Sequence, residues 1–249
     1  MDDSIRSARP REGHGAADDP GVLADDLDVL EDADEGADDL LAALDDPDLV
    51  RPATPAWRAR TAIEMVVSGL LGLYTSFVLS IEAWQLNANP DIVFGCDINS
   101  VISCGTVART WQAQLLGFPN AFLGILFESI VLTISVALLG HVVFPRWFMR
   151  GAQALYTIGL LFALWLFLQS YFVINALCPW CLLITATTTL VWAGLTRINL
   201  RDGHLPLPGS IGPGVRRFIV AGNDWFVTGA FLLVLVAMIV LKYGSALLA

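Results

Sequence analysis

Two of the chain's four cysteines form a Cys-x-x-Cys motif, Cys178-Pro179-Trp180-Cys181, at the beginning of a long apolar segment. This spacing at the start of a helix puts both sulfurs on one face, close enough to form a disulfide. The partial positive charge of a helix N-terminus also stabilises a thiolate, the reactive form of cysteine. The motif therefore predicts a redox-active pair, and we expect Asn175 to cap the helix that begins there.

The other two cysteines, Cys96 and Cys104, flank seven residues in a loop predicted to lie on the same side of a membrane. In a straight helix their Cα atoms would be about 12 Å apart, whereas a disulfide needs roughly 4.4–6.8 Å. Either the segment folds back when the two cysteines bond, or each engages a different partner at different times. Two such pairs on one side favour relayed thiol–disulfide exchange between them.

Two other interpretations of the cysteines stay open at this point. The first is a metal site, because four thiolates can bind zinc. The seven-residue gap between Cys96 and Cys104 fits poorly with the short-spaced pairs of zinc knuckles, so we expect no metal. The second is an inert disulfide that staples the loop. It gives no reason for a second pair at a helix N-terminus.

Five apolar segments of the chain must position these cysteines. Hydrophobic residues make up 55% of the chain, and the mean hydropathy of +0.63 is far above that of soluble domains. About 20 apolar residues cross a bilayer, which predicts spans at 62–84, 121–144, 153–174, 177–195 and 225–241. Too little polar sequence remains to cover these segments in a soluble protein. The predicted fold class is an all-α integral membrane protein.

Charge is distributed very unevenly along the chain. Residues 1–48 hold 17 of the 24 acidic residues and three of the 14 basic ones. Of all basic residues, 12 lie in the N-terminal segment and in the loops after the second and fourth spans, and only Arg109 and Lys242 lie on the opposite side. The positive-inside rule then predicts a cytoplasmic N-terminus, with every cysteine and the C-terminus outside the cell membrane. That side is oxidising, so disulfides persist there.

Four polar or aromatic residues near or inside the spans have both a structural and a functional interpretation. Glu128 lies two turns inside the second span, either as a functional carboxylate or as a neutral, hydrogen-bonded group facing the bundle interior. Glu82 and Trp84 lie near a membrane interface, where we interpret them mainly as anchors. Asn120 begins the second span, either as a plain helix cap or as a polar group that fixes a ligand.

The motifs GCDINSVISCGTV, GFPNAFLG at the start of the second span, and Cys178–Cys181 at the start of the fourth resemble the vitamin K epoxide reductase family. The resemblance covers roughly residues 60–195 and is closest to the bacterial branch, which makes protein disulfides. It implies four helices around a quinone, with a fifth helix as in many bacterial members. The acidic composition of the N-terminal segment predicts a disordered tail over 1–55. After it we expect a catalytic four-helix domain over 56–198, and a cytoplasmic linker with the fifth span over 199–249.

The resemblance also implies roles for single residues. Cys181 would react with the quinone and Cys178 would be its disulfide partner, while Cys104 would attack Cys178 and Cys96 would take electrons from an external thiol protein. The resemblance further implies that Asn120 binds a quinone carbonyl and that Thr185 also lies at the quinone. It implies that Thr110 and Asp97 modulate the cysteines. At the position of Thr185 the vertebrate members have a tyrosine, which favours plain quinone reduction here.

The expected function is that of a membrane thiol–disulfide oxidoreductase that reoxidises a separate thioredoxin-fold dithiol protein. Its electrons would pass to menaquinone or ubiquinone in the membrane pool and support protein disulfide formation. We expect the lipid bilayer as a partner and no nucleic acid. The alternatives are reduction of a vitamin K quinone or epoxide by the same cysteines, and a non-catalytic membrane protein with structural disulfides.

Overall fold

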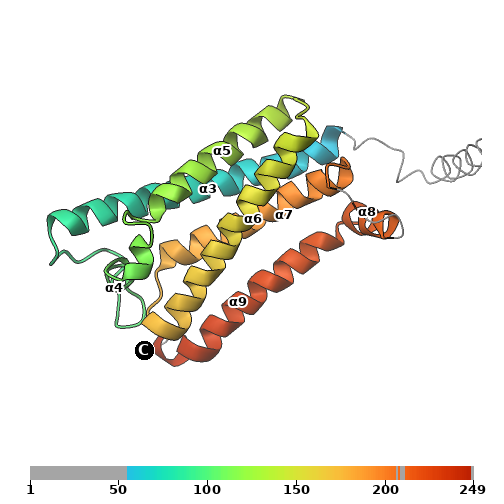
Figure 1. The fold of residues 1–249 in the computed structure, drawn as a ribbon. Helices are drawn as coiled ribbons and strands as arrows, with labels where there is room; N and C mark the ends of the chain where they lie inside the picture. Colours follow the sequence, from blue (N-terminus) through green and yellow to red (C-terminus); the bar gives the residue numbers. More distant parts are fainter. Residues whose placement is uncertain (1–54, 206, 208–210, 248–249) are drawn as a thin grey trace, which may run out of the picture. The chain divides into compact units, whose positions relative to one another are not determined.

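The computed structural model describes residues 55–205, 207 and 211–247, and within them the chain is helical without a β-strand. The predicted acidic tail lies outside this part, except for Pro55, where the first described helix begins. The five long helices are α3 (Pro55–Ala88), α5 (Ala121–Leu139), α6 (Arg146–Gln169), α7 (Pro179–Arg201) and α9 (Asn223–Leu247) (Figure 1). Each is long and apolar enough to cross a membrane. The chain is therefore an all-α, multi-pass membrane protein.

The five predicted spans are confirmed, although their ends shift. α3 continues beyond 62–84 on both sides because its alanine, arginine and glutamine residues favour a helix without being apolar. α5 ends at Leu139, five residues before the predicted 144, where Gly140 caps it. The next helix then starts early, because Pro145 with its fixed φ precedes the first turn of α6.

Four short elements complete the described chain. They are α4 (Cys104–Ala108), the 3₁₀ turn η1 (Trp111–Gln114), the π-helical end of α6 named η2 (Ser170–Ile174), and α8 (Gly212–Val220). α4 and η1 lie in the loop between α3 and α5, beside the end of the bundle where α3 finishes and α7 begins (Figure 1). This loop carries Cys96 and Cys104.

The core of the bundle lies where α3 packs against α5 and α7, and where α6 packs against α7. Its fully buried side chains include Met65, Val131, Met149, Val191 and Leu195. α3 and α5 approach closely at Gly124, where an added Cβ would lie 2.3 Å from Ser76 Oγ. Small residues commonly permit such close approach between membrane helices.

Large apolar side chains cover the outer faces of the long helices. Examples are Leu70 and Phe77 of α3, Ile158 of α6 and Leu233 of α9, all more than half exposed. In a bilayer these side chains face lipid, while the helical hydrogen bonds satisfy the backbone. The outward apolar surface is thus the surface expected of a membrane bundle.

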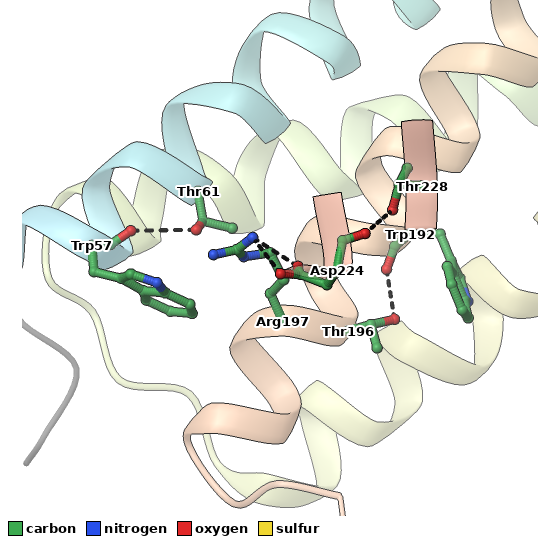
Figure 2. A network of polar contacts seen from close by, with 7 residues as sticks. All are labelled: Trp57, Thr61, Trp192, Thr196, Arg197, Asp224 and Thr228. Carbon is green, nitrogen blue, oxygen red and sulfur yellow. Dashed lines mark hydrogen bonds and ion pairs between the residues drawn. The ribbon is translucent and has the colours of Figure 1, made fainter. Parts of the chain in front are cut away.

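α9 is attached to the bundle at both of its ends. Near its start, the Arg197 guanidinium of α7 donates to both carboxylate oxygens of Asp224 at 2.9 and 2.7 Å (Figure 2). The same guanidinium lies over the rings of Trp57 and Trp225, 5.1 Å from each centroid. Near the other end, Lys242 Nζ donates to Asn175 Oδ1 at 2.8 Å and to the Tyr171 carbonyl. The C-terminal part of α9 therefore lies at the same end of the bundle as the start of α7.

Candidate functional site

The segment from Cys96 to Cys104 folds back on itself, the first of the two alternatives that its spacing allowed. The two cysteines form a disulfide with their Cα atoms 5.7 Å apart. Asn99 makes the turn, because its Oδ1 accepts hydrogen bonds from the N–H groups of Val101 and Ile102. Ser103 then caps α4 by accepting from Thr106 N. The sequence of this loop thus encodes the turn that brings the cysteines together.

Asp97 holds the folded-back segment from inside. Its Oδ1 accepts from Ser103 Oγ at 2.7 Å and from Gly105 N at 2.8 Å, and its Oδ2 accepts from Phe94 N at 2.8 Å. Burial by itself raises the pKa of Asp97, but these hydrogen bonds and the nearby Arg109 charge outweigh it and lower the pKa. Asp97 is therefore an anion that ties the residues beside both loop cysteines to one another.

The start of α7 is tied to this loop by backbone hydrogen bonds. Ser103 N donates to Leu177 O at 3.0 Å, and Leu177 N donates to Val101 O at 2.7 Å. Cys178 itself is the N-cap of α7, and its sulfur accepts from Cys181 N at 3.4 Å. The predicted cap, Asn175, is wrong: it ends η2 with a positive φ of 56° and binds Lys242 instead. Three residues separate it from the helix, too far for a capping bond.

These contacts bring the two cysteine pairs together. Cys104 Sγ, already bonded to Cys96, lies 3.4 Å from Cys178 Sγ. Cys178 and Cys181 are free thiols. Cys104 and Cys178 are buried, whereas Cys96 and Cys181 are partly exposed. The buried sulfur of each pair thus faces the buried sulfur of the other, which is the arrangement that exchange between two disulfides requires.

A cavity of about 170 Å³ borders this contact. Its walls are mainly apolar and come from α3, α5, α6 and α7, and from α4 and η1 of the loop between α3 and α5. A smaller group of polar side chains also lines it: Cys104, Thr110, Gln112, Gln114, Asn120, Glu128, Tyr156, Ser170, Cys178, Cys181, Thr185 and Thr188. An apolar cavity with a few convergent polar groups is the usual form of a site for a small organic ligand or cofactor.

Comparison with known proteins agrees with this geometry. A sequence model of the vitamin K epoxide reductase family matches residues 63–195, more than half of the 249 residues. The chain belongs to the vitamin K epoxide reductase family. No curated protein matched the chain. As a member of this family the chain is a membrane oxidoreductase that acts through thiols. The matched region holds both cysteine pairs and every polar residue of the cavity.

Within this vitamin K epoxide reductase fold, three of the predicted helper residues line the cavity. Asn120 Nδ2 donates to Gln112 O at 2.6 Å, while its Oδ1 is buried with no hydrogen-bond partner. Its side chain makes no capping bond to α5, although the residue stands at the N-cap position. Thr110 Oγ1 donates to Val107 O, and Thr185 Oγ1 donates to Cys181 O. Asp97 and Cys96 lie in the loop and do not line the cavity.

Glu128 faces the interior of the bundle, where only 2% of its surface is exposed. Its Oε2 accepts a hydrogen bond from Tyr156 Oη at 2.9 Å, and both residues line the cavity. Glu128 is therefore hydrogen-bonded inside the bundle, as the structural interpretation expected, and it also lines the cavity, as the functional interpretation expected.

Two residues at the site were missed from the sequence. Gln112 is buried at the cavity, where its Nε2 donates to Gln169 Oε1 at 3.4 Å. Glu82 was interpreted as an interface anchor, but its Oε1 lies 3.6 Å from Cys96 Sγ. Trp84 is 75% exposed, as an anchor would be. The sequence signal that points to Glu82 is its carboxylate near the end of a span, because an acidic side chain within a membrane helix is costly without a partner.

Proposed function

We propose that the protein oxidises an extracytoplasmic thioredoxin-fold dithiol protein and passes the electrons to a membrane quinone, menaquinone or ubiquinone. The observation that supports this most strongly is the 3.4 Å separation of Cys104 Sγ and Cys178 Sγ beside a cavity with apolar walls. Because the disulfide is between Cys96 and Cys104 while Cys178 and Cys181 are thiols, the structure corresponds to one stage of such a relay. At this stage the electrons have reached the pair at the cavity.

The first steps take place at the loop. A thiolate of the partner protein attacks Cys96 Sγ, which is partly exposed, and the bond from Cys96 to Cys104 breaks. The partner's second thiolate then releases Cys96, so the partner leaves with a disulfide and the loop pair holds its two electrons. Cys104, which is 1% exposed, cannot meet an external protein directly. The difference in burial thus supports Cys96 as the cysteine that meets the partner protein.

The next steps transfer the electrons inward. The Cys104 thiolate attacks Cys178 in a disulfide between Cys178 and Cys181, and Cys181 leaves as a thiolate. Cys96 then attacks Cys104, so the loop disulfide forms again and Cys178 is released as a thiolate. Two electrons have moved from the loop pair to the pair at the cavity. The products of this sequence are the bonded and free cysteines that the structure contains.

The residues around the cavity fit a quinone. A bound quinone would take up two electrons and two protons and leave as a quinol. Cys181 lines the cavity, and Thr185, one turn further along α7, donates a hydrogen bond to Cys181 O. Asn120 has a buried oxygen without a partner and an amide group already held by Gln112 O. Its remaining N–H can donate to a carbonyl in the cavity.

The charge distribution supports the orientation that this function needs. Lys242 and Arg109 lie at the end of the bundle with the cysteines, and Lys242 is held there by Asn175. The basic residues before α3 and between the other helices favour the opposite end as cytoplasmic. The cysteines would then face the oxidising side of the plasma membrane, where a secreted dithiol protein can reach Cys96.

The test uses purified protein with a short-chain quinone and two reductants, a reduced thioredoxin-fold protein and dithiothreitol. Cys181→Ala should abolish quinone reduction with both reductants. Cys96→Ala should abolish turnover with the protein and leave turnover with dithiothreitol, because a small thiol can reach the inner pair. A matched control is Thr133→Ala, since Thr133 lies on the exposed side of α5. Loss of both activities in Cys96→Ala would contradict separate roles for the two loop cysteines.

A further inference from the structure

Glu82 lies in the last turns of α3, close to the loop disulfide. Its Oε1 is 3.6 Å from Cys96 Sγ, and its carboxylate and the sulfurs of Cys96 and Cys104 all lie within 4.8 Å of one another. The other oxygen, Oε2, is buried and has no hydrogen-bond partner. A carboxylate in this position is close to reacting atoms and has unused capacity to bind a proton.

No cation in the described part of the chain forms an ion pair with Glu82, since the two ion pairs there join Arg58 to Asp202 and Arg197 to Asp224. Arg109, the basic residue of the same loop, donates to the carbonyls of Pro90 and Ile92 instead. The titratable groups that face Glu82 are therefore Asp97 and the cysteines, including Cys181 from α7. None of these groups is a cation, so they do not form a structural salt bridge with the carboxylate.

We propose that Glu82 is a catalytic residue that carries the proton of Cys96 during thiol–disulfide exchange. The inference rests on the proposed function in that it gives Glu82 a part in the relay, but the chemistry concerns Cys96 alone. A thiol must lose its proton before it attacks a disulfide, and a sulfur that leaves as a thiolate must gain one. Within contact distance of Cys96 Sγ, the Glu82 carboxylate is the group with a free buried oxygen to do both.

One proton moves between Glu82 and Cys96 during each cycle. When the partner's second thiolate attacks the mixed disulfide, Cys96 leaves as a thiolate and takes a proton from Glu82, which becomes an anion. When Cys96 later attacks Cys104, the Glu82 anion takes that proton back and the bond between Cys104 and Cys178 breaks. Glu82 returns to its initial state after each cycle, and no further reactant is needed.

A purely electrostatic role for the carboxylate would have the opposite effect. A negative charge beside Cys96 disfavours its thiolate, so removal of the charge would make exchange faster. A proton carrier beside the sulfur instead speeds exchange, so its removal makes exchange slower. General acid–base catalysis of this kind contributes about 10²–10⁴-fold to a rate. The sign of the effect therefore separates the two roles.

The experiment uses full-length protein with Cys178→Ser and Cys181→Ser, so that Cys96 and Cys104 are the only thiols. Reduction of their disulfide by dithiothreitol, and its formation by oxidised glutathione, are followed by acid quenching and a maleimide mass tag. Glu82→Gln should slow both directions about 10²-fold near neutral pH and remove the acidic limb of the rate–pH profile. Glu82→Asp should restore part of the rate. Asp91→Asn, which removes an exposed charge from the same loop, should change neither.

A second measurement in the same proteins is alkylation of reduced Cys96 by iodoacetamide, which needs a thiolate but no proton carrier. Glu82→Gln should leave alkylation as fast or faster. If exchange in Glu82→Gln stays within threefold of the parent or becomes faster, or if alkylation slows as much as exchange, the proposal is wrong. Neither assay contains quinone or a partner protein. A wild-type enzyme that failed to reduce quinone would refute the proposed function without touching this result.

Discussion

Asp97 should set the reduction potential of the loop disulfide, because it bonds to residues beside both cysteines. Its three hydrogen bonds come from Phe94 N, Ser103 Oγ and Gly105 N, and they close the same turn as the disulfide. Because Asp97 is partly exposed, each bond should contribute about 1 kcal/mol rather than the larger value of a buried charged bond. Asp97→Ala therefore removes up to about 3 kcal/mol of support for the folded-back loop.

The conversion to potential follows from the two-electron couple, for which about 30 mV corresponds to about 1.4 kcal/mol. Loss of all three bonds should make the disulfide easier to reduce by up to about 60 mV. Asp97→Asn keeps an acceptor oxygen toward Ser103 and Gly105 and loses the bond from Phe94. Its shift should be about 20 mV, in the same direction.

The assay is a redox titration of Cys178→Ser, Cys181→Ser protein in dithiothreitol buffers, with bonded and free Cys96 quantified by peptide mass spectrometry. The difference between the Ala and Asn variants isolates the two bonds to Oδ1, because both variants remove the charge. Equal midpoints for wild type and both variants would show that the Asp97 bonds persist unchanged in the reduced loop. The reasoning that couples this network to the disulfide would then be refuted.

Three further predictions follow from other contacts. In a protein that carries both Cys96→Ser and Cys181→Ser, mild oxidation should form a disulfide between Cys104 and Cys178. Their sulfurs are 3.4 Å apart and need to approach by only about 1.4 Å to bond. Peptide mapping that finds both thiols free would contradict the relay contact. Because the pKa of Asp97 is lowered in the folded loop, its stabilisation is complete above its unfolded pKa of about 3.9 and is lost as pH falls through the lower folded value. Pepsin should therefore cut the wild-type loop increasingly below about pH 4, whereas Asp97→Asn should show no such added dependence. Asp224→Ala should lower the free energy of unfolding by about 2–3 kcal/mol, measured by thermal unfolding in detergent. This loss is smaller than for a fully buried ion pair because the Asp224 side chain is 18% exposed. The control Thr228→Val should lose much less, and equal losses would argue against the ion pair.

Much of the architecture follows from the chain read residue by residue. The five spans are visible because each crosses the bilayer alone, with its backbone satisfied internally, so hydropathy and length suffice to find it. The disulfide between Cys96 and Cys104 was one of two outcomes that the spacing allowed, since only a folded-back segment brings those Cα atoms within bonding range. The family resemblance carried by the cysteine motifs agrees with the match over residues 63–195.

Other features depend on how helices far apart in the sequence pack together. Cys104 and Cys178 are 74 residues apart, and their contact arises from backbone bonds between the loop and the α6–α7 junction. Asn175 was expected to cap α7 from its residue type, but Lys242 of α9 binds it while Cys178 takes the cap. Such partners compete across the bundle, so local propensity does not choose between them.

The direction of Glu82 shows the same limit most clearly. The sequence determines that a carboxylate stands in the last turns of a span, at the depth of an interface. Whether it turns outward to water or inward to Cys96 depends on the rotation of α3 against α5 and α7, the two helices that pack against it most extensively. That rotation is fixed by close packing among many side chains at once. The sequence therefore determined which groups are present, and the tertiary structure decided which of them meet.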